Sequence, residues 1–212
     1  MNKFARHTRS QRGFTLVELS IVLVIIGLII GAVLTGQQIM QNGRVTRALN
    51  DIQAYEAQFQ TYQQNNGSLP GDDATASTRF PSGGVTSGNG DGALQGNFDD
   101  ASSGTTETVE VWADLRAAGL VKNQAPVTGQ PPNPFSGIYG FQNGAFGVFT
   151  TTVLCMNNVP GSAAQAIDTR LDDGNANGGS IQAIVTPAGG GTTGTIATSY
   201  AATSNYTMCI RM

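Results

Sequence analysis

The chain has 212 residues, a formal net charge of −3, two cysteines and one histidine. Without a basic patch, this acidic balance argues against nucleic-acid binding. The histidine, His7, precedes the first apolar stretch, and no G-x-S-x-G, H-E-x-x-H or P-loop pattern occurs, so signatures of the common hydrolase and nucleotide sites are missing. We therefore expect no enzymatic activity. Three adjacent acid pairs are only weak indications of a carboxylate dyad, because 14 acids make close pairs inevitable: Asp72-Asp73, Asp99-Asp100 and Asp172-Asp173.

An apolar stretch dominates the amino-terminal part of the chain. It runs from Phe14 to Leu34 and carries a single charge, Glu18. As a helix at about 1.5 Å per residue it reaches roughly 30 Å, the thickness of a bilayer core. The stretch is therefore predicted to span a membrane.

The 13 residues before this stretch are basic. They contain four basic residues and no acid, so this end is expected to stay cytoplasmic while the remainder is exported: Lys3, Arg6, Arg9 and Arg12. A secretory signal peptide would place a small-residue cleavage site after the apolar run, and no A-x-A pattern stands there. The small residue comes before the run instead, as Gly13.

The junction of Gly13 with Phe14-Thr15-Leu16-Val17-Glu18-Leu19 resembles the processing site of type IV prepilins and type II secretion pseudopilins. The resemblance implies that a prepilin peptidase cuts after Gly13 and methylates the new amino terminus on Phe14. It also implies that Glu18 neutralises the amine of a neighbouring subunit during assembly. The alternative for Glu18 is an acid in the first helical turn that is favoured by the helix dipole and reaches the headgroups.

Three segments follow from this reading: a leader over residues 1–13, a long helix over 14–66 with its membrane-spanning or filament-core part at 14–34, and one exported head over 67–212. Removing the leader takes away four of the 11 basic residues and leaves all 14 acids, so the mature net charge is −7. Six apolar residues continue the helical period beyond Gly36: Val45, Leu49, Ile52, Tyr55, Phe59 and Tyr62. They predict one face packed against the head, and Asn65-Asn66-Gly67 predicts the end of the helix.

The head is expected to combine loops, short helices and antiparallel strands. Residues 68–103 are predicted to be loop, and residues 107–118 a short helix that buries Val109, Trp112, Leu115 and Ala118. A hairpin is predicted over 138–159 with its turn at Asn143-Gly144, followed by a helix at 162–171 and strands at 180–186 and 205–210. The fold class is therefore α+β and pilin-like, a long amino-terminal helix on a small antiparallel sheet.

Cys155 and Cys209 lie on the predicted exported side, where oxidising conditions favour pairing. One disulfide is expected, worth about 3–4 kcal/mol in the chain-entropy model. Type IV pilins often close a carboxy-terminal loop in this way. Two free buried thiols are the alternative.

A calcium site is the one cofactor that the sequence suggests. Asp173, Asn175 and Asn177 reproduce the D-x-N-x-N-G opening of a calcium loop, and Asp168 and Asp172 lie just upstream. The twelfth position is Ile184 in place of glutamate, so the loop is not an EF-hand. The alternative is a turn whose Asp and Asn side chains bind their own backbone.

The resemblance implies a structural subunit of a type IV filament that assembles through its apolar helix with itself and other pilin-like subunits. Prepilin peptidase and an inner-membrane assembly platform would be its partners. The expected location is the inner membrane, with a single span and a cytoplasmic amino terminus, and then a periplasmic or cell-surface filament. A pseudopilin of a type II secretion system is the alternative, and a membrane-anchored periplasmic binding domain that never polymerises is a third reading.

Overall fold

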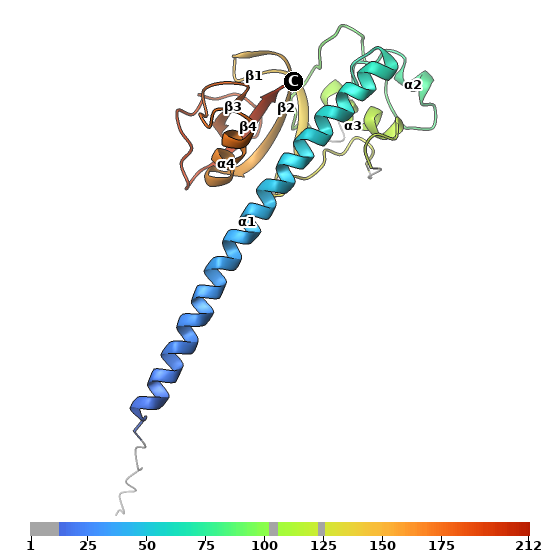
Figure 1. The fold of residues 1–212 in the computed structure, drawn as a ribbon. Helices are drawn as coiled ribbons and strands as arrows, with labels where there is room; N and C mark the ends of the chain where they lie inside the picture. Colours follow the sequence, from blue (N-terminus) through green and yellow to red (C-terminus); the bar gives the residue numbers. More distant parts are fainter. Residues whose placement is uncertain (1–12, 102–105, 123–125) are drawn as a thin grey trace, which may run out of the picture. The chain divides into compact units, whose positions relative to one another are not determined.

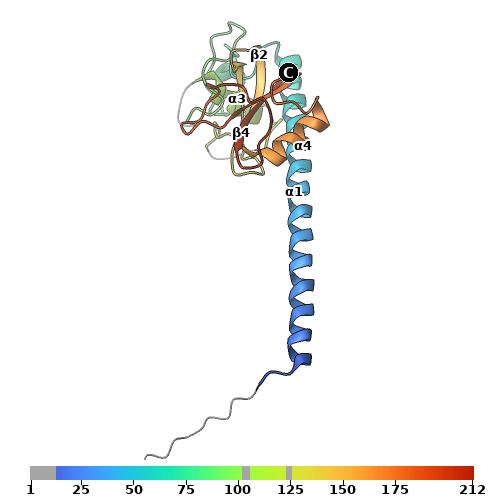
Figure 2. The same cartoon turned by 90° about the vertical axis from the view of Figure 1, so that its left-hand side faces the viewer.

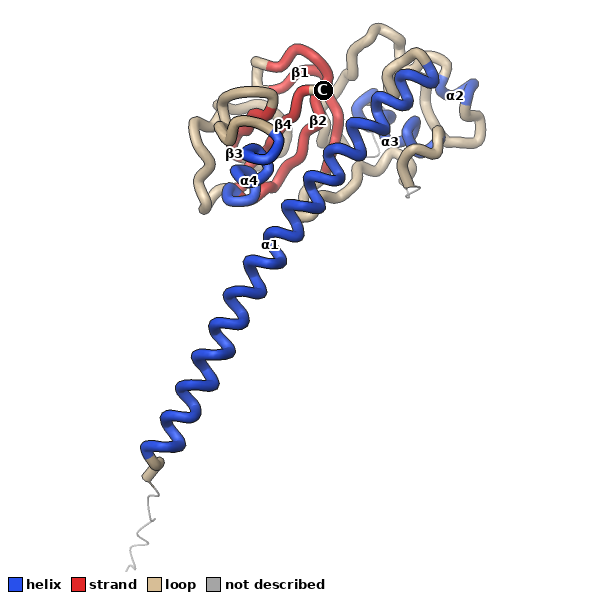
Figure 3. Tube along the Cα trace, viewed as in Figure 1, coloured by secondary structure: helices blue, strands red, loops and turns tan. Residues whose placement is uncertain are grey.

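The computed structural model describes residues 13–101, 106–122 and 126–212. It separates into two units, one up to Asn42 and one from Gly43 to Met212. Residues 1–12, which hold most of the predicted leader, lie outside the described residues. Helices and loops make up most of the second unit, with one small sheet (Figure 3).

The first helix, α1, is continuous from Leu16 to Asn66 and crosses Gly36 and Gly43 without a break (Figure 1). It ends as predicted: Gly67 has φ +71° and donates its N–H to the carbonyl of Gln63 at 2.8 Å. The predicted apolar stripe is confirmed, because its residues are buried or half-buried in the second unit, and Ala48 joins them.

The sheet has four antiparallel strands in the order β1-β2-β4-β3. Their bounds are Tyr139–Ala145 for β1, Phe149–Pro160 for β2, Ile181–Val185 for β3 and Asn205–Arg211 for β4. Helix α4, Gly161–Leu171, follows β2 directly and packs against β2 and β4 (Figure 2). This arrangement confirms the predicted α+β fold of a long helix with a small antiparallel sheet.

The sheet buries apolar side chains on both faces, as the alternation of strand residues requires. Leu154 and Met156 of β2 belong to the main core, which they share with α1 and with α3, Glu107–Ala117. Aromatic rings join these elements: Tyr55 lies 5.1 Å from Trp112, and Phe141 lies 4.8 Å from Phe59, between ring centroids.

The opposite face of the sheet carries the disulfide. Cys155 of β2 and Cys209 of β4 are direct register partners, and their sulfur atoms are bonded, which confirms the predicted pair. Phe98 and Phe149 pack beside them in a second, smaller cluster. Both cysteines are fully buried.

Two parts of the sequence-based fold were wrong in detail. The hairpin is present, but its turn lies at Phe146-Gly147, which have φ +57° and +70°, and Val148 N–H bonds Ala145 at 3.1 Å. Gly144 instead occupies an irregularity in the β1–β2 register. The segment 68–103 is also not all loop, because it contains the one-turn helix α2, Ala76–Arg79.

Candidate functional site

The start of α1 is closed by reciprocal side-chain hydrogen bonds. Glu18 Oε2 accepts bonds from the backbone N–H and the hydroxyl of Thr15, both at 2.8 Å, and Thr15 Oγ1 accepts the backbone N–H of Glu18 at 3.2 Å. This is a capping box, which satisfies N–H groups that the first helical turn leaves without intrahelical partners. The Glu18 carboxylate is thereby held next to the residue that follows Phe14.

Phe14 and Gly13 precede the first helical residue, Leu16, so the predicted cleavage point is in non-helical chain. Phe14 is exposed over 82% of its surface. The peptide bond between Gly13 and Phe14 is therefore not covered by the helix that follows it.

From Phe14 to Leu34 every large apolar side chain is exposed, from 47% for Ile26 to 84% for Leu16. Among the described residues, α1 is the only helix long and apolar enough to cross a membrane. So large an apolar surface requires lipid or other protein around it. A Cβ added at Gly27, Gly31 or Gly36 would meet no atom within 4 Å. Helices of other subunits could therefore approach the backbone closely at these three positions.

The last turn of α4 and the loop after it bring together three of the predicted calcium ligands. One carboxylate oxygen from each of Asp168, Asp172 and Asp173 lies within 4.8 Å of the others. Burial raises the pKa of Asp168, against hydrogen bonds from Tyr200 and Gly174, and the charges of Asp172 and Asp173 raise it further. The three acids thus form one negatively charged site.

Backbone N–H groups already use much of this site. Asp168 accepts Gly174 N–H at 3.0 Å, and Asp172 Oδ2 accepts those of Ser180 and Ile181 at 2.6 and 2.9 Å. Asp173 Oδ1 accepts Asn175 N–H at 2.8 Å, as the turn alternative predicts. Asn175 and Asn177 are exposed on the same loop. Oxygen donors suited to calcium are present, together with the hydrogen bonds of a self-supporting turn.

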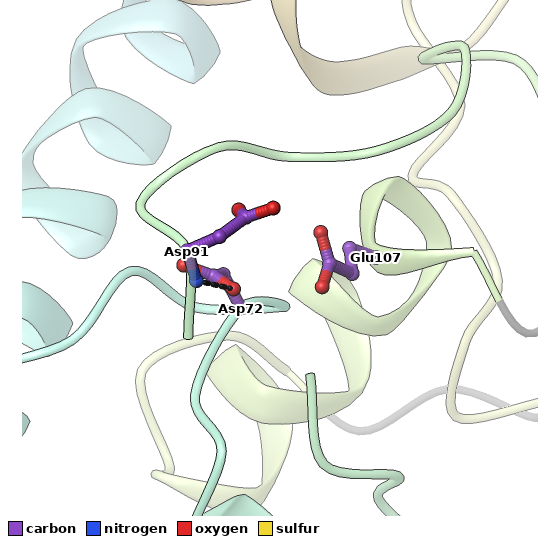
Figure 4. Close-up of side chains that lie close together, drawn as sticks. All are labelled: Asp72, Asp91 and Glu107. Atoms are coloured by element: carbon purple, nitrogen blue, oxygen red, sulfur yellow. Dashed lines mark hydrogen bonds between the residues drawn. The ribbon is translucent and has the colours of Figure 1, made fainter. Parts of the chain in front are cut away.

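A second carboxylate group joins three distant segments (Figure 4). Asp72 follows α1, Asp91 lies in the glycine-rich loop, and Glu107 begins α3. The loop wraps around the other two acids: Asp72 accepts the N–H groups of Gly90, Asp91 and Gly92 at 2.6, 3.2 and 2.7 Å, and Glu107 accepts those of Asn89 and Gln95, both at 3.0 Å. The backbone N–H groups of the loop therefore bind the carboxylates of Asp72 and Glu107, which belong to the same chain.

The same chemistry recurs throughout residues 67–212. Each acid of this range accepts at least one backbone N–H: Asp72, Asp73, Asp91, Asp99, Asp100, Glu107, Glu110, Asp114, Asp168, Asp172 and Asp173. The three adjacent acid pairs are therefore engaged in holding loops. Sequence reasoning missed the roles of Glu107, Glu110 and Asp114, because only the fold brings their backbone partners near them.

The comparison with family models places a prokaryotic N-terminal methylation motif at residues 8–34. The comparison with curated proteins finds no match to the chain. The matched segment contains Gly13, Phe14, the capping pair Thr15–Glu18 and the exposed apolar part of α1. The chain therefore carries the amino-terminal signature of type IV pilins and pseudopilins, which are processed as prepilins.

Proposed function

We propose that the chain is a non-enzymatic structural subunit of a type IV filament. The observation that carries this proposal is the methylation motif over residues 8–34, which leads directly into a helix with its apolar side chains exposed. A filament gives that surface a protein environment after it leaves the lipid. The carboxylates of the head hold loops, which supports a structural role over a catalytic one.

Processing is the first step of the proposed function. Prepilin peptidase cleaves between Gly13 and Phe14 and methylates the amine of Phe14. Before cleavage the chain lies in the inner membrane with its basic end in the cytoplasm and residues beyond α1's apolar part outside. The exposed, non-helical junction is consistent with access by a peptidase.

Assembly then depends on Glu18. The capping box holds its carboxylate against Thr15, the residue after the new amino terminus, so the charge is oriented before a second subunit arrives. The amine of a neighbouring subunit replaces the Thr15 hydrogen bonds, and neighbouring helices replace lipid. The partners are further copies of the chain, other pilin-like subunits and an inner-membrane assembly platform, in a periplasmic or cell-surface filament.

A type II secretion pseudopilin is the second candidate, because the same motif serves both classes. A non-polymerising anchored domain is the third, and it would need neither cleavage nor Glu18. The buried disulfide and the loop-rich head favour a surface pilus over the pseudopilus, and the acidic loop at Asp168–Asp173 favours the reverse.

The test is to shear the cells and measure the intact mass of the protein in the filament and membrane fractions. A methylated chain beginning at Phe14 in abundant sheared fibres is expected for a pilin. The same mature chain found only in the membrane indicates a pseudopilin or minor subunit. A chain that retains its first 13 residues in both fractions would overturn the filament proposal.

Glu18→Ala separates assembly from processing. The variant should be cleaved after Gly13 and should accumulate as mature protein in the membrane, without sheared fibres. Ser20→Ala is the matched control, because Ser20 is also a polar residue in the apolar part and bonds only the carbonyl of Val17. Normal fibre yield from Glu18→Ala would remove the assembly role of this residue.

We further propose that Asp168, Asp172 and Asp173 bind calcium, with Asn175 and Asn177 as further oxygen donors. The melting temperature of the mature chain in detergent should then rise when calcium replaces EDTA. Asp173→Asn should reduce this rise, whereas Asp100→Asn, a change to an acid outside both carboxylate groups, should preserve it. An unchanged melting temperature with calcium would contradict the proposal.

A further inference from the structure

Asp114 is a fully buried acid on α3 with an incomplete set of hydrogen bonds. Its Oδ2 accepts the backbone N–H of Gly71 at 2.7 Å, which ties the turn after α1 to the middle of α3. Its Oδ1 is buried without a hydrogen-bond partner. A buried charged oxygen without a partner is unfavourable, so the hydrogen-bonding state of Asp114 matters for this contact.

The neighbouring donors are committed elsewhere. The hydroxyl of Tyr62, at the end of α1, donates to Asp73 Oδ2 at 3.0 Å, and Asp73 Oδ1 accepts the N–H and hydroxyl of Thr75. Arg79 of α2 lies 3.4 Å from Asp73 Oδ2. The single phenol proton of Tyr62 lies near two carboxylates: it donates to Asp73 at 3.0 Å, and a weaker interaction with Asp114 lowers the pKa of that acid.

A proton on Asp114 completes this network. A protonated carboxyl group is a donor, and the Tyr62 oxygen retains lone pairs that can accept from it. The resulting chain runs from Asp114 through Tyr62 to Asp73 and Arg79, and it leaves a single negative charge beside the guanidinium. Without the proton, two carboxylates share a buried site with one nearby cation.

We propose that Asp114 is the proton-binding group of a pH-sensitive latch that holds the turn after α1 against α3. The latch is closed when Asp114 is protonated. When Asp114 ionises, the cost of a buried charge and repulsion from Asp73 and Glu110 outweigh the stronger Gly71 hydrogen bond, and the latch is weakened. It joins three elements, since Tyr62 belongs to α1, Gly71 and Asp73 to the turn, and Asp114 to α3. It is independent of the filament function proposed above.

The surrounding charges agree with this assignment. Burial raises the pKa of Asp114 to about 7, and the charges of Asp73 and Glu110 raise it further, against the hydrogen bonds from Gly71 and Tyr62, which lower it. Arg79 of α2 is turned to Asp73, and the other nearby arginine, Arg116, binds the backbone carbonyls of residues 122, 127 and 129. The carboxylate of Asp72 is turned to the loop at 90–92.

Proton binding by Asp114 is linked to folding, and this linkage decides whether stability rises or falls with pH. The folded chain keeps a proton on Asp114 at pH values where the unfolded chain has lost it, because the folded pKa lies above the ordinary value. Stability from this group is therefore fully present below about pH 4 and is lost progressively as the pH rises from there to about 7. The latch should open toward alkaline pH.

The experiment measures the melting temperature of the mature chain in detergent between about pH 4 and pH 8. Trp112, the only tryptophan, is buried on α3 and reports unfolding by its fluorescence. The wild type should lose melting temperature across this range, whereas Asp114→Asn, which cannot ionise, should lose much less. Equal losses in both proteins would overturn the latch.

Glu110→Gln provides a test that does not alter Asp114 itself. Removing the Glu110 charge should move the midpoint of the wild-type transition to lower pH, because one of the charges that keep Asp114 protonated is gone. Asp91→Asn is the control, since it removes an exposed charge outside this network and should leave the midpoint unchanged. An unmoved midpoint in Glu110→Gln would overturn the assignment to Asp114, even if Asp114→Asn fails to fold.

Discussion

A glycine occupies position 71 because no side chain fits there. Its φ is +87°, and a Cβ would lie 2.3 Å from the carbonyl oxygen of Glu107 and 2.8 Å from a methyl group of Val111. Both neighbours belong to α3, so neither can move without disturbing that helix. The close approach of backbone to helix is what allows the Gly71 N–H to reach Asp114.

We predict that Gly71→Ala lowers the free energy of unfolding by about 2–4 kcal/mol, the sum of a left-handed backbone penalty and an overpacking penalty. Gly92→Ala is the matched control: φ is +84° there, but a Cβ meets nothing within 4 Å, so about 1 kcal/mol is expected. Thermal unfolding followed by Trp112 fluorescence measures both. Equal destabilisation by the two changes would show that the clash with α3 is relieved at little cost.

Site residues could be predicted from the sequence where their partners are close along the chain. The grouping of Asp168 with Asp172 and Asp173 is a local pattern, and the structure brings the three aspartates together. The roles of Gly13 and Glu18 rest on an equally local pattern and stay predictions. Asp114 could not be found in this way. Its partner Gly71 lies 43 residues away, and only the packing of the turn on α3 makes them neighbours.

The disulfide joins strands that the backbone already pairs. Leu154 and Met156 flank Cys155 in the register of β2 with β4, and the two cysteines are separated by 54 positions in the chain. Because hydrogen bonds hold the strands on both sides, the sheet should persist without the sulfur bond. The bond acts mainly on the unfolded chain, where it closes a long loop.

We predict that reduction of the disulfide lowers the free energy of unfolding by about 3–4 kcal/mol while the fold is retained. Unfolding of the wild type should be measured with and without a reductant, and far-ultraviolet circular dichroism should report the retained sheet. Cys155→Ala with Cys209→Ala serves as a second measurement that does not depend on the reductant. Loss of secondary structure in both cases would mean that the strand pairing depends on the bond.

The helices and strands were largely predictable because their periods are strong. The predictions that were wrong concern the turns and loops around these helices and strands. The pair Asn143-Gly144 favours a turn locally, but the register of β1 with β2 places the turn at Phe146-Gly147. Helix α3 was expected to bury one face, yet its polar residues are buried too, since the loop over 86–95 supplies backbone N–H groups to Glu107 and Glu110.

Residues 67–212 hold their loops largely with carboxylates, so the stability of the whole chain should depend on pH in two directions. Hydrogen bonds lower the pKa of Asp91, and those from Thr75 and Tyr62 outweigh burial and lower that of Asp73. Burial raises the pKa of Asp51, Glu56 and Asp114. Acids of the first kind stabilise the fold once ionised, and their contribution is lost below about pH 4.

Acids of the second kind act in the opposite direction, because the folded chain holds their protons more tightly than the unfolded chain does. Their contribution is lost as the pH rises from about 4 toward the raised pKa values. We therefore predict that the melting temperature is highest between about pH 4 and pH 6 and falls on both sides. The alkaline fall should survive added salt, since buried charges are screened little, and a maximum above pH 7.5 would contradict the prediction.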